Sequence, residues 1–260
     1  MNENKTYYEK FDWERANLAS QLTEKINSIV NAIPNDVNSI IDIGCGDGSI
    51  SNKLIDNYKV VAIDRSRNAL QYVKSHRIQA SADYLPIKSS SADMVFSSEM
   101  LEHLPEDIFN NTIIEFKRIS KRYIFLTFPN DENIKKNFVH CSNCGFEFNK
   151  SYHLRTLNKK IIEKLFPDYS IKHSFFTGSL IRPYKKILSD LKHKYSPFTS
   201  WIPPHWTPDN RRKTMCPNCN TTFDIPYKFN SLSFFLDSIN SLISPKRPYQ
   251  ICILLEKKND

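Results

Sequence analysis

Glycine and aspartate alternate in one short segment, Asp42-Ile43-Gly44-Cys45-Gly46-Asp47-Gly48, which lies between an apolar run typical of a buried strand and a pattern typical of a helix. Glycines at such a turn let the backbone approach a ligand, because no Cβ stands in the way. Asp64 follows the next apolar run, and a carboxylate there can accept hydrogen bonds from both hydroxyls of a ribose. The two segments together predict a pocket for an adenosine-containing cofactor.

The spacing of the glycines separates two classes of cofactor. Dinucleotide sites use Gly-x-Gly-x-x-Gly to present a helix N-terminus to a pyrophosphate, whereas this chain has Gly-x-Gly-x-Gly. Asp42 and Asp47 would also repel a pyrophosphate, so a cationic cofactor that bears an amino acid fits better than NAD. The segment resembles the first motif of the class I S-adenosylmethionine (SAM)-dependent methyltransferases, over about residues 38–178 and the last strand.

This resemblance implies SAM as the cofactor, and it implies roles for individual residues. Asp42 and Gly44 would flank the methionine part of SAM, and Asp64 would hold the ribose. Asp83, Tyr84 and Leu85 would border the adenine. The expected cofactor-binding residues are Asp42, Gly44, Gly46, Gly48, Asp64, Arg65, Asp83, Tyr84 and Ser98. The alternatives are a glycine-rich turn that binds nothing and a site for NAD.

A polar segment, Ser97-Ser98-Glu99-Met100-Leu101-Glu102-His103, follows the strand expected at residues 94–96 and should face the methyl acceptor. On a helix, Glu99, Glu102 and His103 would share one face and could hold Mg²⁺ or Mn²⁺, with His140 or His153 as a fourth ligand. Such a site resembles those of ubiquinone-pathway O-methyltransferases and of terminal-ribose methyltransferases of small RNAs. Without a metal, His103 or His153 could act as a general base. A third alternative is that Glu102 and His103 only pack at a helix start.

Two cysteine pairs, Cys141-Ser-Asn-Cys144-Gly145 and Cys216-Pro-Asn-Cys219-Asn220, have the spacing of zinc knuckles. Gly145 and Asn220 each tolerate the positive φ that the turn after the second thiolate requires. We therefore expect one structural zinc bound by Cys141, Cys144, Cys216 and Cys219, which would join two distant loops. The alternatives are two redox pairs or buried thiols without metal.

The apolar runs at residues 40–43, 60–63, 94–96 and 123–128 read as buried parallel strands, with helical spacing between them. Strands at residues 170–176 and 249–255 should pair at one edge of the sheet. Helices are expected at about residues 18–30, 50–55, 69–73, 113–118 and 154–166. The alternation predicts a doubly wound, Rossmann-like α/β sheet that carries a small zinc-binding lobe.

The same patterns divide the chain into four parts. We expect an N-terminal helical lid at 1–37, a methyltransferase core at 38–178 with a zinc-knuckle loop at 138–153, an insertion lobe with the second knuckle at 179–247, and the final core strand and tail at 248–260. No run of apolar residues is long enough for a membrane span, and no signal peptide is evident, so we expect a soluble, cytoplasmic protein.

The resemblance and the cysteine pairs favour an enzyme that methylates a hydroxyl of a sugar or glycan. A short likeness around Cys141 to Cys144 and His153 to methyltransferases of surface-polysaccharide biosynthesis points the same way. The net charge of +8 favours a nucleic acid instead, through RNA ribose 2′-O-methylation, if residues such as Arg211, Arg212 and Lys213 form a basic stripe. A non-catalytic cofactor-fold module is the third hypothesis.

Overall fold

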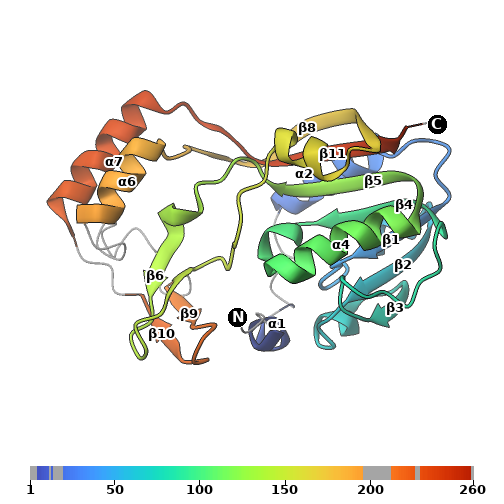
Figure 1. The fold of residues 1–260 in the computed structure, drawn as a ribbon, viewed down its shortest axis with the longest axis horizontal. Helices are drawn as coiled ribbons and strands as arrows, with labels where there is room; N and C mark the ends of the chain where they lie inside the picture. The colour runs from blue at the N-terminus through green and yellow to red at the C-terminus, as the bar shows by residue number, and fades with distance from the viewer. Residues whose placement is uncertain (1–4, 12, 14–19, 196–211, 226–228, 259–260) are drawn as a thin grey trace. The chain divides into compact units, whose positions relative to one another are not determined.

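The computed structural model describes residues 5–11, 13, 20–195, 212–225 and 229–258 (Figure 1). The chain divides into two compact units. We call residues 8–130, 157–179 and 248–260 the sheet unit. Residues 1–7, 131–156 and 180–247 form the second, which we call the cysteine unit.

The sheet unit is built around a seven-stranded sheet with the strand order β3-β2-β1-β4-β5-β11-β8. Strands β3, β2, β1, β4 and β5 are parallel to one another, and β11 runs antiparallel to β5. The expected pairing of the last two strands at one edge is confirmed, because β8 is the edge strand beside β11. The bounds are β1 Ser39–Ile43, β2 Lys59–Asp64, β3 His76–Gln79, β4 Ala92–Ser98, β5 Ser120–Pro129, β8 Tyr169–Ile181 and β11 Arg247–Lys257.

Helices pack on both faces of this sheet because its central strands are apolar on both sides. In β5, Tyr123 and Phe125 belong to one apolar layer, whereas Ile124 and Leu126 belong to the other. Helices α2 (Ser20–Ala32) and α3 (Ser51–Leu54) contribute to the first layer. Helices α4 (Glu106–Ile119) and α5 (Lys159–Leu165) contribute to the second, and α4 crosses the near face of the sheet in Figure 1. This is the doubly wound α/β fold that the sequence predicts.

Several elements differ from the sequence expectation. Strand β3 was not expected, because its side chains lie at the sheet edge and are mostly exposed. Residues expected as a helix at 69–73 form a 3₁₀ turn, η2 (Ala69–Tyr72). Helix α5 begins at Lys159 rather than at 154, because the Asn158 side chain accepts a hydrogen bond from the Ile161 N–H and caps the helix there. In the first expected helix, Leu18 lies outside the described residues.

The cysteine unit contains two short antiparallel ribbons. One pairs β6 (Phe138–His140) with β7 (Glu147–Asn149), and the other pairs β9 (Lys213–Met215) with β10 (Thr222–Asp224). Their small core combines two cysteines with aromatic side chains, among them Phe148, Tyr152 and Phe223. A 3₁₀ turn, η4 (Ile134–Asn137), precedes β6.

The described part of this unit also contains helices α6 (Lys186–Tyr195) and α7 (Ser231–Ile243), which lie side by side (Figure 1). A hydrogen-bonded cluster joins them: Asp237 accepts bonds from the Tyr184 hydroxyl at 2.7 Å and from the Lys192 ammonium at 2.6 Å. A further short helix, α1, covers Lys5–Lys10. None of the described helices is both long and apolar enough to cross a bilayer.

Candidate cofactor and metal sites

The carboxyl ends of β1, β2 and β4 lie side by side at the same end of the strands, because these strands are parallel and adjacent. The strand order reverses between β1 and β4, and open α/β sheets bind their ligands at that point. The sequence places Gly44 after β1, Asp64 at the end of β2 and Ser98 at the end of β4. Three of the predicted cofactor residues therefore lie at the site that the topology favours.

The three glycines of the loop after β1 all have positive φ, with values of 77° at Gly44, 55° at Gly46 and 74° at Gly48. The loop also leaves no room for side chains. A Cβ added to Gly44 would lie 2.4 Å from Cγ of Met100, and one added to Gly46 would lie 3.0 Å from the ring of Trp13. Glycine is required here by both backbone conformation and space.

Asp64 ties this loop to the end of β2. One carboxylate oxygen accepts the Gly46 N–H at 2.9 Å, and the other accepts the Ser66 N–H at 2.8 Å. Burial raises the pKa of Asp64, and these two hydrogen bonds oppose the increase. The N–H of Arg65 also hydrogen-bonds this carboxylate, whose two oxygens together have about four acceptor positions. Asp64 can therefore hold the loop and accept a ligand hydroxyl at the same time.

Asp42 is fully buried at the end of β1. Ser51 donates a hydrogen bond to Oδ2, while Oδ1 has no hydrogen-bond partner among the described residues. Burial raises the pKa of Asp42 to about 7, against the effect of the Ser51 bond. Burying the ionised form of this carboxyl group costs free energy, and a cation bound close by would offset that cost.

The expected adenine border follows β3. Oδ1 of Asp83 is buried and has no hydrogen-bond partner in the described part of the chain. The Tyr84 side chain is exposed, whereas Leu85 is buried in the core and its N–H donates to Glu115 at 2.9 Å. The backbone carbonyl of Arg65 accepts a hydrogen bond from Gln79. The segment therefore combines the exposed ring of Tyr84 with a buried hydrogen-bond acceptor, Oδ1 of Asp83, beside the anchored Leu85.

A chain of polar groups crosses the carboxyl ends of β4 and β5. Ser98 and Thr127 are joined by their hydroxyls at 2.8 Å, and Thr127 donates to Oε1 of Glu99 at 2.8 Å. Lys25 of α2 donates to the same oxygen at 3.1 Å. Sequence reasoning missed Lys25 and Thr127. The signal for Lys25 was its place on the apolar face of α2, next to Ile26 and four residues before Ile29.

The helical face expected for Glu99, Glu102 and His103 is absent, and that prediction is wrong. Glu99 has a positive φ of 53° and precedes a 3₁₀ turn, η3 (Leu101–His103), so it cannot share a face with Glu102. The hydrogen bonds to Lys25 and Thr127 direct Glu99 elsewhere. Glu102 is buried, and its Oε1 lies 3.9 Å from Nε2 of His103. These two side chains form a pair without Glu99.

The other two histidines considered as ligands belong to the cysteine unit. Nδ1 of the buried His153 is paired with Oε2 of Glu132, which sequence reasoning did not consider. Nε2 of His140 lies 3.0 Å from Oε2 of Glu147, across the β6–β7 ribbon. Each histidine therefore has a carboxylate partner within its own unit.

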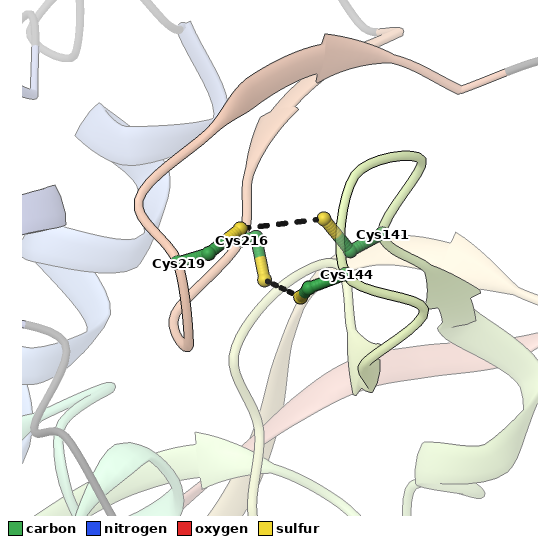
Figure 2. A group of neighbouring side chains, drawn as sticks. All are labelled: Cys141, Cys144, Cys216 and Cys219. Atoms are coloured by element: carbon green, nitrogen blue, oxygen red, sulfur yellow. Dashed lines mark hydrogen bonds between the residues drawn. The ribbon is translucent and has the colours of Figure 1, made fainter.

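The four predicted cysteines come together at the tips of the two ribbons (Figure 2). The Sγ atoms of Cys141 and Cys219 are 3.6 Å apart, as are those of Cys144 and Cys216, and all four lie within 4.8 Å of one another. Four thiolates bound to one zinc at about 2.3 Å would be separated by about 3.8 Å along the tetrahedron edges. The sulfur positions fit a tetrahedral metal site.

The two cysteine loops are built alike. The N–H of Gly145 donates to the carbonyl of Cys141 at 3.0 Å, and that of Asn220 donates to Cys216 at 2.9 Å. Both residues have positive φ, 70° and 58°, as the sequence predicts. Each loop also reaches across to the other, because Asn143 donates to Sγ of Cys219 and Asn218 donates to Sγ of Cys144. The free thiols are thus arranged as two matching knuckles.

Comparison with known proteins agrees with this fold. Residues 41–123 match a family described as a methyltransferase domain. A 117-residue segment is 29% identical to an uncharacterized methyltransferase of Schizosaccharomyces pombe, and it covers 42% of this chain and 44% of that protein. The match therefore spans less than half of that relative's length.

Solved structures of methyltransferases resemble nearly the whole chain. A SAM-dependent methyltransferase from Archaeoglobus fulgidus has a TM-score of 0.54 at 13% identity, with 97% of this chain and 98% of that chain covered. A chain from the complex between the Haloferax volcanii Trm112 methyltransferase activator and a methyltransferase has a TM-score of 0.56 at 12% identity, with 99% and 97% covered. The chain thus has the α/β fold of these methyltransferase structures, and residues 41–123 match a methyltransferase-domain family.

Proposed function

We propose that the protein is a SAM-dependent O-methyltransferase whose acceptor is a hydroxyl of a sugar or glycan. The observation that carries the cofactor assignment is the glycine loop at the strand-order reversal, bordered by Asp42 and Asp64. The buried carboxyl oxygens Oδ1 of Asp42 and Oδ1 of Asp83 favour a ligand that brings positive charge and hydrogen-bond donors. SAM carries an ammonium, a sulfonium and the amino group of adenine.

The cofactor-binding residues proposed here are those expected from sequence. Asp64 would accept the ribose hydroxyls, Tyr84 and Asp83 would border the adenine, and Asp42 with Gly44 would flank the methionine part. When bound, SAM supplies an activated methyl group on a cationic sulfur. The chain's main task is then to position an acceptor and to exclude water.

An acceptor hydroxyl must also lose its proton as the new C–O bond forms. We assign that step to His103, which lies just beyond the carboxyl end of β4. The buried carboxylate of Glu102, 3.9 Å from Nε2, favours the protonated imidazole and so helps it to hold the proton. His153, with Glu132 as its partner, is a second candidate base, and Glu99 would position rather than bind a metal.

The four-cysteine cluster would hold one structural zinc. Its observed sulfur spacing is near that of a zinc tetrahedron. The peptide N–H of Asn143 and the side-chain amides of Asn143 and Asn218 donate to the sulfurs and would stabilise thiolate charge. A closed set of four thiolates leaves no open position for substrate, so this metal would order the cysteine unit rather than take part in the reaction.

A ribose hydroxyl of RNA is the second candidate acceptor, favoured by the net charge of +8. Arg211, one residue of the expected basic stripe, lies outside the described residues. Arg212 and Lys213 belong to the cysteine unit, where Lys213 begins β9 and is exposed. A screen of sugars, glycans and RNA with isotopically labelled SAM separates the two acceptors.

Cofactor binding is tested by calorimetry with SAM on Asp64→Ala. We expect the affinity to fall by roughly 1–3 kcal/mol, because the ribose hydroxyls lose a charged acceptor and the loop loses its tie. Asp64→Asn keeps one side-chain oxygen and should lose less. Asp56→Ala, at an exposed position of the same unit, is the matched control. Unchanged affinity in Asp64→Ala would refute the ribose assignment.

The role of His103 is tested by the pH dependence of turnover with the acceptor found in the screen. We expect His103→Ala to lower kcat about 100-fold or more and to remove a bend near neutral pH, with SAM affinity retained. His76→Ala, on the exposed strand β3, should leave both unchanged. Activity that vanishes with chelators and returns with Mg²⁺, while the zinc content is constant, would favour metal-assisted catalysis instead.

A further inference from the structure

Helix α7 buries two polar side chains beside Leu236 and exposes most of its apolar side chains. Ser233 and Asn240 are buried, whereas Phe235 is 61% and Leu242 is 87% exposed. A helix on the surface of a globular protein shows the reverse pattern. The exposed side of α7 would therefore be more stable in an apolar environment than in water.

Hydrogen bonds hold α7 in this orientation. The Asn240 side chain accepts the Lys185 N–H at 2.9 Å and donates to the Pro183 carbonyl at 3.2 Å. One turn earlier, Asp237 accepts bonds from Tyr184 and Lys192. A rotation that buried the phenylalanines would break these bonds and expose a desolvated ion pair, so the outward direction of the apolar side chains is set by the interior.

The neighbouring helix α6 adds to the exposed apolar surface. Ile187, Leu191 and Tyr195 follow one another at four-residue spacing, share one helical face and are exposed, Ile187 by 75%. We call the exposed apolar residues of the two helices the outer face; its members are Ile187, Leu191, Tyr195, Leu232, Phe234, Phe235, Leu242 and Ile243.

The charges around the outer face are mostly of one sign. Lys185, Lys186 and Lys194 are exposed at or beside α6, and Lys246 is exposed just after α7. The acid of α7, Asp237, is engaged inside with Lys192. Exposed phenylalanine and leucine beside several lysines is the composition of helices that lie in the interface of anionic membranes.

We infer that the helix pair α6/α7 docks onto an anionic lipid bilayer. The side chains of the outer face would enter the interface between headgroups and acyl chains, and the lysines would contact lipid phosphates. This arrangement requires no membrane-spanning helix. It is also independent of the proposed reaction, since binding to lipid can be measured without SAM or an acceptor.

The test is co-sedimentation of the full chain with vesicles, either of pure phosphatidylcholine or of phosphatidylcholine and phosphatidylglycerol in equal parts. We expect binding to the anionic vesicles that weakens as salt is added. Phe235→Ser with Leu242→Ser should weaken binding about tenfold or more. Lys185→Gln with Lys186→Gln should weaken it about fivefold per lysine. Ile114→Ser, at a site 61% exposed on α4, is the matched control and should bind normally.

Thermal unfolding followed by circular dichroism checks that each variant is folded. Equal sedimentation of the Phe235→Ser, Leu242→Ser protein and the wild type would overturn the inference, as would an absence of binding to anionic vesicles. Ultracentrifugation adds a third outcome. A wild-type dimer that becomes a monomer in the serine variant, without any vesicle binding, would make the outer face a contact between copies and would equally overturn it.

Discussion

In the sheet unit, strand β5 sends alternate side chains into two apolar layers, and large residues such as Phe96 and Phe116 are fully buried there. Among the described residues, the ribbons of the cysteine unit share one small apolar cluster, and two of its buried members are Cys141 and Cys216. The sheet can therefore rely on the burial of apolar surface, whereas the ribbons need an additional link. A metal bound to four thiolates would provide that link.

The largest expected effect follows from removing the metal. Structural zinc contributes roughly 10–16 kcal/mol in small zinc peptides, so Cys216→Ser should abolish zinc binding and open the ribbons. Hydrogen exchange should rise in residues 131–156 and 212–225 while the seven-stranded sheet stays protected. Cys252→Ser, at a buried cysteine of β11, should leave zinc in place. If protein purified without chelator contained no zinc, the proposal that a metal links the two ribbons would be wrong.

The converse substitution removes apolar core from the sheet unit. Phe116 of α4 is fully buried, and Phe116→Ala should lower the free energy of unfolding by about 3–5 kcal/mol through lost burial and a cavity. Zinc content should not change. Ile114→Ala on the exposed side of the same helix should cost less than about 0.5 kcal/mol. Urea unfolding followed by fluorescence measures both, and loss of zinc in Phe116→Ala would show that the two units are not independent.

A third prediction concerns Asp42, the buried carboxyl group of the sheet unit. Burial raises its pKa to about 7 in the folded chain. Between about pH 4 and pH 7 the carboxyl group is therefore protonated in the folded chain but ionised in the unfolded chain. The free energy of unfolding should therefore fall as pH rises from about 4 to about 7 and then level off, by a few kcal/mol. Asp42→Asn should lack this fall. Parallel stability curves for the two proteins across that range would contradict the burial of a titrating group.

The smallest effect concerns the turn in the second knuckle. Asn220 has a φ of 58°, which alanine adopts at a cost of about 1 kcal/mol and glycine adopts freely. Asn220→Ala should weaken zinc binding in competition with a chelator by about that amount, and Asn220→Gly should not. Equal zinc affinity in the alanine and glycine variants would mean that the backbone strain is relieved elsewhere in the unit.

The sequence by itself determined the features that depend on local pattern. Continuous apolar runs predicted the central strands, because strands buried on both faces have no polar side. The residues after Cys144 and Cys219 predicted positive φ, which the backbone shows, and the glycines around Cys45 predicted a turn without Cβ atoms. The pairing of the last two strands at one edge also followed from pattern. These features need little information from distant residues.

Only the tertiary structure decided how distant residues meet. The spacing of Glu99, Glu102 and His103 indicated one helical face, yet Lys25 and Thr127 hold Glu99 in a left-handed turn, and no local rule foresees two partners from α2 and β5. Strand β3 has too few buried side chains to show a pattern, and it forms because β2 offers an open edge. The spacing along the chain identified the two cysteine pairs. Their approach to within 4.8 Å depends on two ribbons from distant parts of the chain, since Cys144 and Cys216 are 72 positions apart. Contacts of that range depend on chain topology, which local sequence does not encode.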